Sequence, residues 1–277
     1  MAGCAVVALL GGCGVVADRP GATTPDPTTD TPRLGPPPAD GAVLLDFDDA
    51  VSEPGAAIAT ATNRGSGTVR VWVSAVNGGR VRIEPGPVGS VVRFPARSTE
   101  SPAPAAALVV QVRQSEDPLA PGEADFEFGA DVALDEGAGD SAAGETTSDN
   151  GENVVQRGLW SGPAQYKLQV DRGTASCVLR GSRGEAKVKL AEPLPPDVWF
   201  RLRCRLVDGV LSIAAADVHG VEPDQEASAP VAVGTIEFPV TVPLAVGAKV
   251  DAEGSVPSSS SDQLNGRVDH VWFRLLD

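Results

Sequence analysis

Apolar and polar residues alternate with a period of two along most of the chain from Ala42 onward. Residues 69–73 (VRVWV), 165–171 (QYKLQVD) and 187–190 (KVKL) show the alternation most clearly. Because successive side chains of a strand point to opposite faces of a sheet, this pattern predicts half-buried strands. Helical spacing of apolar residues is nearly absent, and Gly and Pro interrupt the chain at short intervals. The sequence therefore predicts an all-β fold, a two-sheet antiparallel jelly-roll sandwich.

Three polar stretches interrupt the alternation, at residues 136–151, 221–230 and 252–263. Strand-like segments of the same character resume after each of them, so we interpret all three as surface loops and not as linkers. A chain of 277 residues without an internal repeat can hold one large sandwich. We expect a single domain over residues 42–277.

The first apolar stretch, residues 2–17, carries no charge. It is short for a membrane-spanning helix, which needs about 20 residues, but it suits a signal-peptide core followed by small residues. The run Leu10-Gly11-Gly12-Cys13 resembles the bacterial lipobox, which implies cleavage before Cys13 and a lipid on its sulfur. The usual basic residue before the core is absent, so a plain signal peptide and a short membrane anchor are the alternatives. We predict a signal peptide over residues 1–12 and a lipoprotein exported to the outer face of the cell membrane.

Residues 18–41 consist mainly of Pro, Thr, Asp and Gly and have little apolar surface to bury. Such a composition favours an extended chain. Residues 13–41 are therefore predicted to be a lipid-anchored spacer between the membrane and the domain.

The formal net charge of −15 restricts the partners. Nucleic acid and anionic lipid headgroups both require a basic patch, and the chain has no run of Lys or Arg longer than two residues. We expect no nucleic-acid partner, and membrane contact only through the lipid on Cys13. The chain is rich in Ala, Val, Gly and Pro and has four Lys against eighteen Arg, a composition typical of a GC-rich genome.

Two cysteines of the C-terminal half, Cys177 and Cys204, lie on the apolar sides of strand-like segments. An exported chain meets oxidising conditions, so these two can form a disulfide. Closing a loop of this length stabilises a fold by roughly 3–4 kcal/mol in the chain-entropy model. The alternative is a pair of buried free thiols.

Several segments together resemble the laminin-G and concanavalin-A-like lectin and glucanase superfamily as found in actinobacterial exported proteins. The resemblance implies a jelly roll of about a dozen strands, and it does not by itself fix a function. It is strongest over residues 150–277. The segments that carry it are VLLDFDDA, FEFGADVALDE, Asn153–Trp160, Gln165–Asp171, SCVLRGS, VWFRLRCRLVDG and the closing Gly266-Arg267-Val268-Asp269-His270-Val271.

The candidate for catalysis is the run Glu123-Ala124-Asp125-Phe126-Glu127, in which alternation places three carboxylates on one strand face. Retaining glucanases of the superfamily carry a similar strand. The resemblance implies Glu123 as nucleophile, Asp125 as the tuning acid and Glu127 as acid/base. Pro121-Gly122 directly before the run, the polar face expected opposite Phe126, and an aromatic content of only 4% weigh against this interpretation. We expect no enzymatic activity and keep a retaining β-glucanase as the alternative.

A structural calcium site is a second candidate. Asp46 and Asp48 share one face of the first strand, and Asp269 lies on the last strand, which commonly neighbours the first in jelly rolls. Ordinary surface carboxylates on edge strands are the favoured alternative. No cofactor is required by the sequence. His219 and His270 are isolated histidines and make no zinc-ligand set.

For binding, the aromatic residue of greatest interest is Trp160, because Ser161-Gly162-Pro163 follow it in a turn at a loop rim. A core or half-buried packing role is the alternative for Trp160, and Trp72, Trp199 and Trp272 are expected to have packing roles. The sequence thus favours a non-catalytic cell-surface binding or structural module, for a glycan or an envelope polymer. A scaffold that displays residues 136–151 to an extracellular protein is the further alternative.

Overall fold

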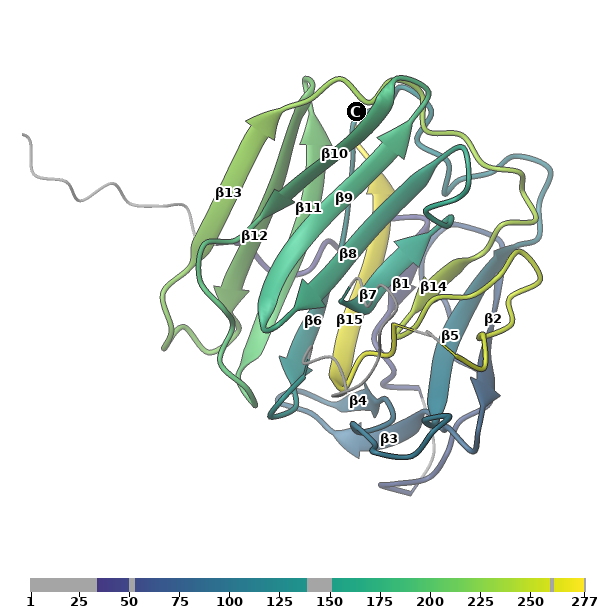
Figure 1. The fold of residues 1–277 in the computed structure, drawn as a ribbon, viewed down its shortest axis with the longest axis vertical. Helices are drawn as coiled ribbons and strands as arrows, with labels where there is room; N and C mark the ends of the chain where they lie inside the picture. The colour runs from purple at the N-terminus through teal and green to yellow at the C-terminus, as the bar shows by residue number, and fades with distance from the viewer. Residues whose placement is uncertain (1–33, 50–52, 139–150, 260–261, 277) are drawn as a thin grey trace, which may run out of the picture. The chain divides into compact units, whose positions relative to one another are not determined.

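The computed structural model describes residues 34–49, 53–138, 151–259 and 262–276, which form fifteen strands and no helix (Figure 1). All of the strand pairs are antiparallel, and they build two sheets that pack face to face. The jelly-roll sandwich predicted from the alternation is confirmed. In the described part of the chain, no helix is long and apolar enough to cross a membrane.

The larger sheet has eight strands, and the long strand β15 lies near its centre. Its order is β13 (Gln225–Pro230), β12 (Val210–Asp217), β11 (Trp199–Val207), β6 (Phe126–Leu134), β15 (Gly266–Leu275), β4 (Ser90–Arg93) and β3 (Arg82–Pro85), and β1 (Val43–Leu45) also pairs with β15. The first and last strands are neighbours, as the sequence led us to expect.

The smaller sheet has seven strands. Its order is β10 (Gly184–Lys189), β9 (Thr174–Gly181), β8 (Gln165–Asp171), β7 (Glu152–Arg157), β14 (Leu244–Val246), β5 (Ala105–Val112) and β2 (Val69–Val76). In Figure 1, β7 to β10 run side by side in front of the larger sheet.

The core lies between the sheets and is built from the apolar half of each alternating strand. On β8, Tyr166, Leu168 and Val170 are completely buried, while the residues between them point to the outer face. Tyr166 stacks on Phe273 with ring centroids 5.2 Å apart and lies 5.0 Å from Phe128. Its hydroxyl donates to the carbonyl of Leu119 at 3.2 Å, and burial raises its pKa. The side of β8 that the alternation predicts to face the core is therefore the side that does so.

One of the three predicted loops contains a strand. Residues 221–230 were predicted to be a loop, but Gln225–Pro230 form β13 at the edge of the larger sheet. An edge strand pairs on one side only, so its polar residues stay in water, and Ala227 and Ala229 suffice to pack on the core. Pro230 at its end is tolerated for the same reason.

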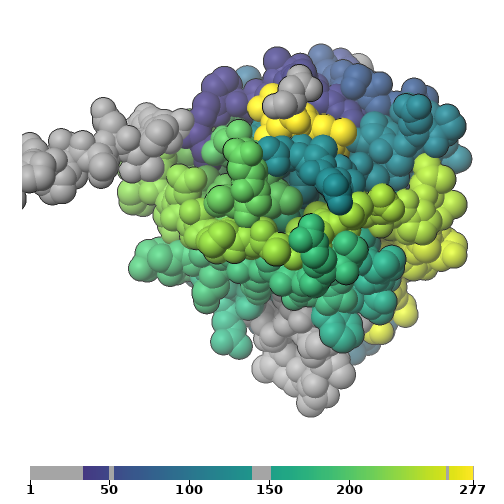
Figure 2. All heavy atoms as spheres, turned by 90° about the horizontal axis from the view of Figure 1, so that it is seen from above, coloured from purple at the N-terminus to yellow at the C-terminus, as the bar shows by residue number. Residues whose placement is uncertain are grey.

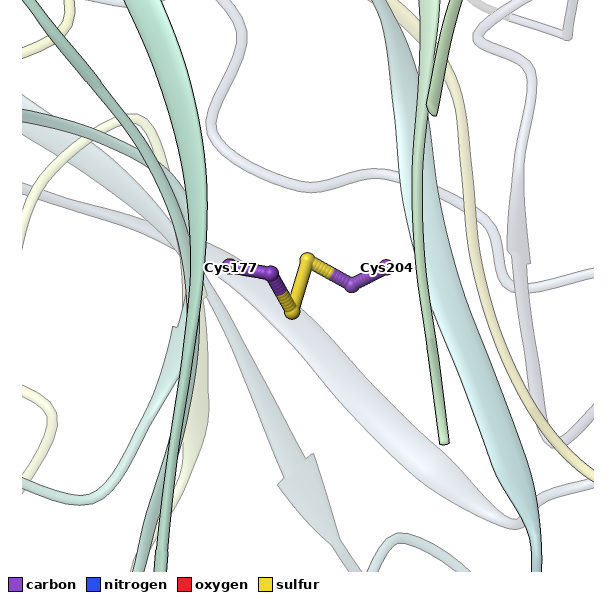
Figure 3. The surroundings of a disulfide bond; sticks show 2 residues. All are labelled: Cys177 and Cys204. Atoms are coloured by element: carbon purple, nitrogen blue, oxygen red, sulfur yellow. A yellow bond between two sulfur atoms is a disulfide. The ribbon is translucent and has the colours of Figure 1, made fainter. Parts of the chain in front are cut away.

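The disulfide prediction is confirmed. Cys177 of β9 and Cys204 of β11 are bonded to each other, with their Cα atoms 5.7 Å apart (Figure 3). Because β9 and β11 belong to different sheets, the bond crosses the core and fixes one layer to the other.

One end of the sandwich is closed by two segments that lack regular strands, residues 113–125 and 231–243. Gly122 and Ile236 form a backbone bridge between them. Seen from above in Figure 2, the yellow-green chain that follows β13 crosses this end between the two layers. Beneath it, the fully buried Arg157 makes a two-pronged ion pair with Asp117 at 2.9 and 2.6 Å.

The stretch from Leu34 to Gly41 lies on the outer face of the larger sheet, although the sequence assigned it to the extended spacer. The carbonyl of Gly35 accepts a hydrogen bond from Arg201 at 2.9 Å, and Asp40 pairs with Arg274 at 2.8 Å. The predicted signal peptide and the lipid attachment site Cys13 lie outside the described residues.

Candidate ligand groove on the seven-stranded sheet

The outer face of β7 to β10 is hollowed into a groove of about 720 Å³. Most of its lining is polar, which is unusual for a small-molecule pocket and suits a ligand with many hydroxyl or amide groups. We call it the polar groove. Its lining residues are Gln156, Leu159, Trp160, Ser161, Gln165, Lys167, Gln169, Asp171, Val178, Glu185, Lys187, Lys249 and Asp262.

The floor of the polar groove is the outward half of β8. Gln165, Lys167 and Gln169 alternate with the core residues of the same strand, and each has an exposed fraction of only 3–5%. Three long polar side chains in a row on one strand offer both donors and acceptors to whatever lies above them.

A buried carboxylate holds two of the groove's ammonium groups. The side chain of Asp262, 5% exposed, lies 3.8 Å from the Nζ of Lys167 and 3.4 Å from that of Lys249. The carbonyl of Asp262 also accepts a hydrogen bond from the backbone N–H of Asn153 on β7 at 2.9 Å. The chain that follows β14 is thus fixed to the floor at one wall of the groove.

The opposite wall is the loop between β7 and β8. Two amides hold the carbonyl of Gly158, with Gln156 donating at 2.6 Å and Gln165 at 3.2 Å. Gly158 has a φ of 77°, and a Cβ at this position would collide with the carbonyl of Ala164 and the ring of Phe238. Glycine is therefore required for the tight start of this loop.

Trp160 stands at the tip of this loop with 69% of its surface exposed. Arg180 of β9 donates to its carbonyl, and the guanidinium lies 5.3 Å from the ring centroid. Arg180 is itself paired with Glu185. An indole held in this way presents a large ring surface to the groove without a large loss of side-chain entropy.

All four lysines of the chain lie on or beside this face. Lys167, Lys187 and Lys249 line the polar groove, and Lys189 follows Lys187 on the same side of β10. Asp171, Glu185 and Asp262 are interspersed among them, so the lining is mixed in charge within a chain of net charge −15.

The outer face of the eight-stranded sheet has a different chemistry, because its charges are paired across strands. Asp131 of β6 accepts two hydrogen bonds from Arg201 of β11, both of 2.7 Å. Glu127 accepts from Arg274 at 3.0 Å and lies 3.8 Å from Arg205.

The three carboxylates of the catalytic alternative are not assembled as predicted. β6 begins at Phe126, because the chain makes a turn at Pro121 and Gly122 and only then enters the strand. Glu123 is exposed and accepts from the Thr235 hydroxyl at 3.2 Å.

The other two carboxylates bind other partners. Asp125 accepts from the N–H of Asp208 at 3.1 Å. Glu127 is buried in its Arg pairs on the face opposite the polar groove. The three therefore do not share one strand face.

The proposed calcium ligands bind other partners, and Asp46 and Asp48 follow β1 and do not share a face of it. Asp46 pairs with Arg64 at 2.9 Å, and Asp48 accepts from the N–H of Ser90 at 2.8 Å. Asp269 instead lies 3.0 Å from the imidazole of His270. Within the residues that the structure describes, no group of three or more His, Cys, Asp or Glu side chains could hold a metal ion.

His270 occupies a bulge in β15, where its φ of 44° turns the imidazole toward two carboxylates. Hydrogen bonds to Asp131 and then to Asp269 raise the pKa of His270 to about 10 against the opposing effect of burial. Burial raises the pKa of Asp269 in spite of its contact with the imidazole.

The remaining tryptophans have packing roles, as expected. Trp272 is 1% exposed and Trp199 is 8% exposed, while Trp72 is half-buried against the apolar patch over β5 and β14. Trp160 is the exposed one of the four.

The sequence interpretation missed the floor of the groove. Lys167 and Gln169 were noticed only as the polar half of an alternating strand. The three lysines at positions 167, 187 and 189 fall at outward positions of strand-like segments, which was a usable signal in the sequence, whereas the place of Lys249 beside them is seen only in the structure. The contribution of Asp262 depends on a contact between distant segments, which alternation does not report.

No family model matches the chain, and no curated protein matches it. Similar solved structures do exist. The binding domain of botulinum neurotoxin serotype G aligns with a TM-score of 0.54 and 7% identity, over 86% of this chain and 48% of that one. The binding domain of serotype D/C aligns with a TM-score of 0.53 and 10% identity, over 85% and 49%.

Botulinum neurotoxin type C, whose cell entry is described as dependent on two ganglioside molecules, aligns with a TM-score of 0.52 and 9% identity, over 85% and 48%. The LG1–3 region of the laminin α2 chain aligns with a TM-score of 0.43 and 6% identity, over 85% and 65%. The chain spans about half the length of the toxin structures. At this level of identity the likeness to the toxin structures shows the fold and does not transfer a function.

Proposed function

We propose that this chain is a non-catalytic binding module that holds a carbohydrate or a polyhydroxylated envelope polymer in the polar groove. The single observation that supports it best is the exposed Trp160 ring, fixed by Arg180, above a floor of amide and ammonium groups. Sugar hydroxyls both donate and accept hydrogen bonds, and the C–H faces of a sugar ring pack on aromatic rings. The groove supplies both kinds of contact.

The surroundings of the groove also suit recognition. The amides of Gln156 and Gln165 are already bound to the Gly158 carbonyl, and the wall at Asp262 is fixed by ion pairs. A site formed before the ligand arrives loses less conformational entropy on binding. The similar toxin structures are binding domains, which is compatible with this proposal at the level of the fold alone.

The test is binding of the purified domain to a panel of soluble glycans and cell-envelope polysaccharides, followed by isothermal titration of each positive. We expect Trp160→Ala to weaken binding about tenfold or more, because loss of a buried anchoring aromatic costs about 1.4 kcal/mol or more. Trp160→Phe should retain most of the affinity. Val221→Ala, at an 82% exposed position outside the groove, is the matched control and should change nothing.

If no glycan of the panel binds, the carbohydrate proposal is wrong and a protein partner becomes the better hypothesis. If glycans bind and Trp160→Ala binds equally well, the polar groove is the wrong site.

The proposed location is the outer face of the cell membrane, with the domain tethered through a lipid on Cys13. The support for it is the Leu10-Gly11-Gly12-Cys13 run. Fractionation of cells that express the full chain tests it: Cys13→Ser should move the protein from the membrane to the soluble fraction. Unchanged membrane retention of this variant would refute the lipid anchor.

A further inference from the structure

Beside the polar groove lies a second hollow of opposite character, which we call the apolar pocket. It has a volume of about 180 Å³ and lies between the β7–β8 loop, the segment before β14 and the chain that follows β14. Its apolar lining residues are Leu159, Pro163, Ala164, Phe238, Pro239, Val242, Pro243, Ala245, Val250 and Ala252, and Gln156, Gly158, Ser161, Gly162 and Asp251 complete it.

The two hollows adjoin each other. Gln156, Leu159 and Ser161 line both of them, so a ligand that lies across these three residues would reach both. From this geometry we infer that the polar groove and the apolar pocket form one bipartite site for a glycan that carries a short acyl or alkyl substituent. The inference builds on the proposed function, since the polar groove is its other half.

The walls of the apolar pocket are held by the core and are therefore ready for a ligand. The Phe238 ring lies 4.5 Å from the guanidinium of Arg157 and meets the Tyr166 ring edge-on at 5.5 Å. The carbonyl of Val242 accepts from Arg157 at 3.1 Å, and its N–H donates to Pro239 at 2.9 Å. The buried guanidinium of Arg157 thus contacts two of the pocket's walls.

Two of the three polar side chains at the edge of the pocket, those of Gln156 and Asp251, are already engaged inside the protein. Gln156 donates to the Gly158 carbonyl at 2.6 Å, and Asp251 accepts from the N–H groups of Glu253 and Ser255 at 3.1 and 2.7 Å. A hydroxyl group placed in the pocket would find few partners there, whereas an apolar group would lose only its contact with water.

The volume sets the size of the substituent. An apolar protein cavity of about 150 Å³ accepts benzene. A pocket of about 180 Å³ therefore takes a group of that size, which corresponds to an acyl chain of four to six carbons or one ring.

The first test uses fluorobenzene as the probe and fluorine NMR as the measurement, on the purified domain without any glycan. We expect binding with a Kd on the order of 1 mM, the affinity that burial of one such ring supports. Ala252→Trp, at an exposed position of the rim, and Ala245→Leu, on the floor, should each weaken this binding about tenfold or more. Trp160→Ala should leave it unchanged, because Trp160 does not line the apolar pocket.

Ala252→Trp is the variant that keeps the test decisive if Ala245→Leu fails to fold. No fluorobenzene binding by the wild-type domain, or equal binding by wild type and Ala252→Trp, would overturn the apolar pocket as a site.

The second test asks whether the polar groove and the apolar pocket bind one ligand together. Each acylated glycan that binds in the first panel is measured again after mild alkaline removal of its ester groups. We expect deacylation to weaken binding about tenfold or more in the wild type, and to have no effect in Ala252→Trp. Equal affinity before and after deacylation would mean that the apolar pocket does not take part in glycan binding, and it would refute the bipartite site. If no glycan of the panel binds, the proposed function is refuted instead. The fluorobenzene result would still show whether the apolar pocket binds an apolar group.

Discussion

The two outer faces of this sandwich are built from the same alternation and have different chemistry. On the eight-stranded sheet, Asp131 and Glu127 are each held by guanidinium groups from neighbouring strands. On the seven-stranded sheet, β8 presents amides and an ammonium group to a groove with an exposed indole at its rim. Arginine–carboxylate pairs thus characterise the outer face of the eight-stranded sheet, and lysines with amides characterise the face that carries the proposed ligand groove.

This difference makes a general point about outward residues of a β-sandwich. Burial alone does not distinguish the faces, since Asp131 is 3% exposed and Lys167 is 5% exposed. The two faces differ in the kind of partner. Two-pronged Arg–carboxylate pairs join neighbouring strands of the eight-stranded sheet, whereas amide–carbonyl bonds and Lys–Asp262 contacts lie beside the hollow of the polar groove.

The largest expected effect comes from breaking a pair on the eight-stranded face. Asp131→Ala removes the partner of Arg201 and of His270, which leaves a nearly buried cation without its carboxylate. The free energy of unfolding in urea should fall by about 3–5 kcal/mol. Asp40→Ala is the matched control, because Asp40 is 82% exposed in its pair with Arg274, and it should cost less than about 1 kcal/mol. Equal losses for the two variants would contradict a supporting role for this face.

The next effect concerns the bond that joins the two layers beneath these faces. Cys177→Ala with Cys204→Ala opens a loop closed over a sequence separation of 27 residues. The chain-entropy model gives a loss of about 3–4 kcal/mol in the free energy of unfolding. Glycan binding by the folded double variant should remain, because neither cysteine lines the groove. A double variant as stable as the wild type would show that the core alone fixes the layers.

A smaller effect depends on pH. The pKa of His270 is raised from 6.5 to about 10, first by its hydrogen bond to Asp131, so its charged form stabilises the fold. That stabilisation is complete below about pH 6.5, where the imidazole of the unfolded chain is also charged, and it declines until the folded group loses its proton near pH 10.

His270→Asn, which tolerates the positive φ, should therefore lower the Tm most at pH 6, with a difference that disappears above pH 10. Melting curves of both proteins from pH 6 to 10.5 measure it. A difference that stays constant over this range would rule out the charged imidazole as its cause.

The smallest effect on stability is expected on the groove face. Trp160→Ala removes a mostly exposed ring and its contact with Arg180, so the free energy of unfolding should change by about 0.5 kcal/mol or less. The same variant should lose glycan affinity. A loss of several kcal/mol in urea denaturation would make Trp160 a structural residue and remove the contrast between the faces.

The fold could be predicted largely because its strands are local patterns. Residues 165–171 show which side of β8 enters the core, and the two cysteines fall on inward positions. The polar strand β13 escaped prediction because an edge strand needs few apolar residues. The three carboxylates of the catalytic alternative do not share a strand face, because the chain turns at Pro121-Gly122 and Glu123 lies before the start of β6.

The candidate site could be predicted only in part. The turn after Trp160 made it a candidate and left a packing role as the alternative, and the walls of both hollows depend on contacts between segments far apart in the chain. Arg157 and Asp117 are 40 residues apart, and the side-chain oxygen of Gln263, beside Asp262, accepts a hydrogen bond from the backbone N–H of Ala106 across 157 residues. Such contacts leave no periodic signal in the sequence, so the apolar pocket was not foreseen.

The segment Leu34–Gly41 decides how the domain is oriented when it is held from its N-terminal side. It is attached to the outer face of the eight-stranded sheet through Arg201 and Arg274. A tensile load on this segment would reach the sandwich on the face opposite the groove and would pass into β11 and β15. Both arginines are also paired with carboxylates of β6, the strand between β11 and β15. If the anchor and the groove act as proposed, the tether and a bound polymer would lie on opposite sides of the sandwich and would not compete for space.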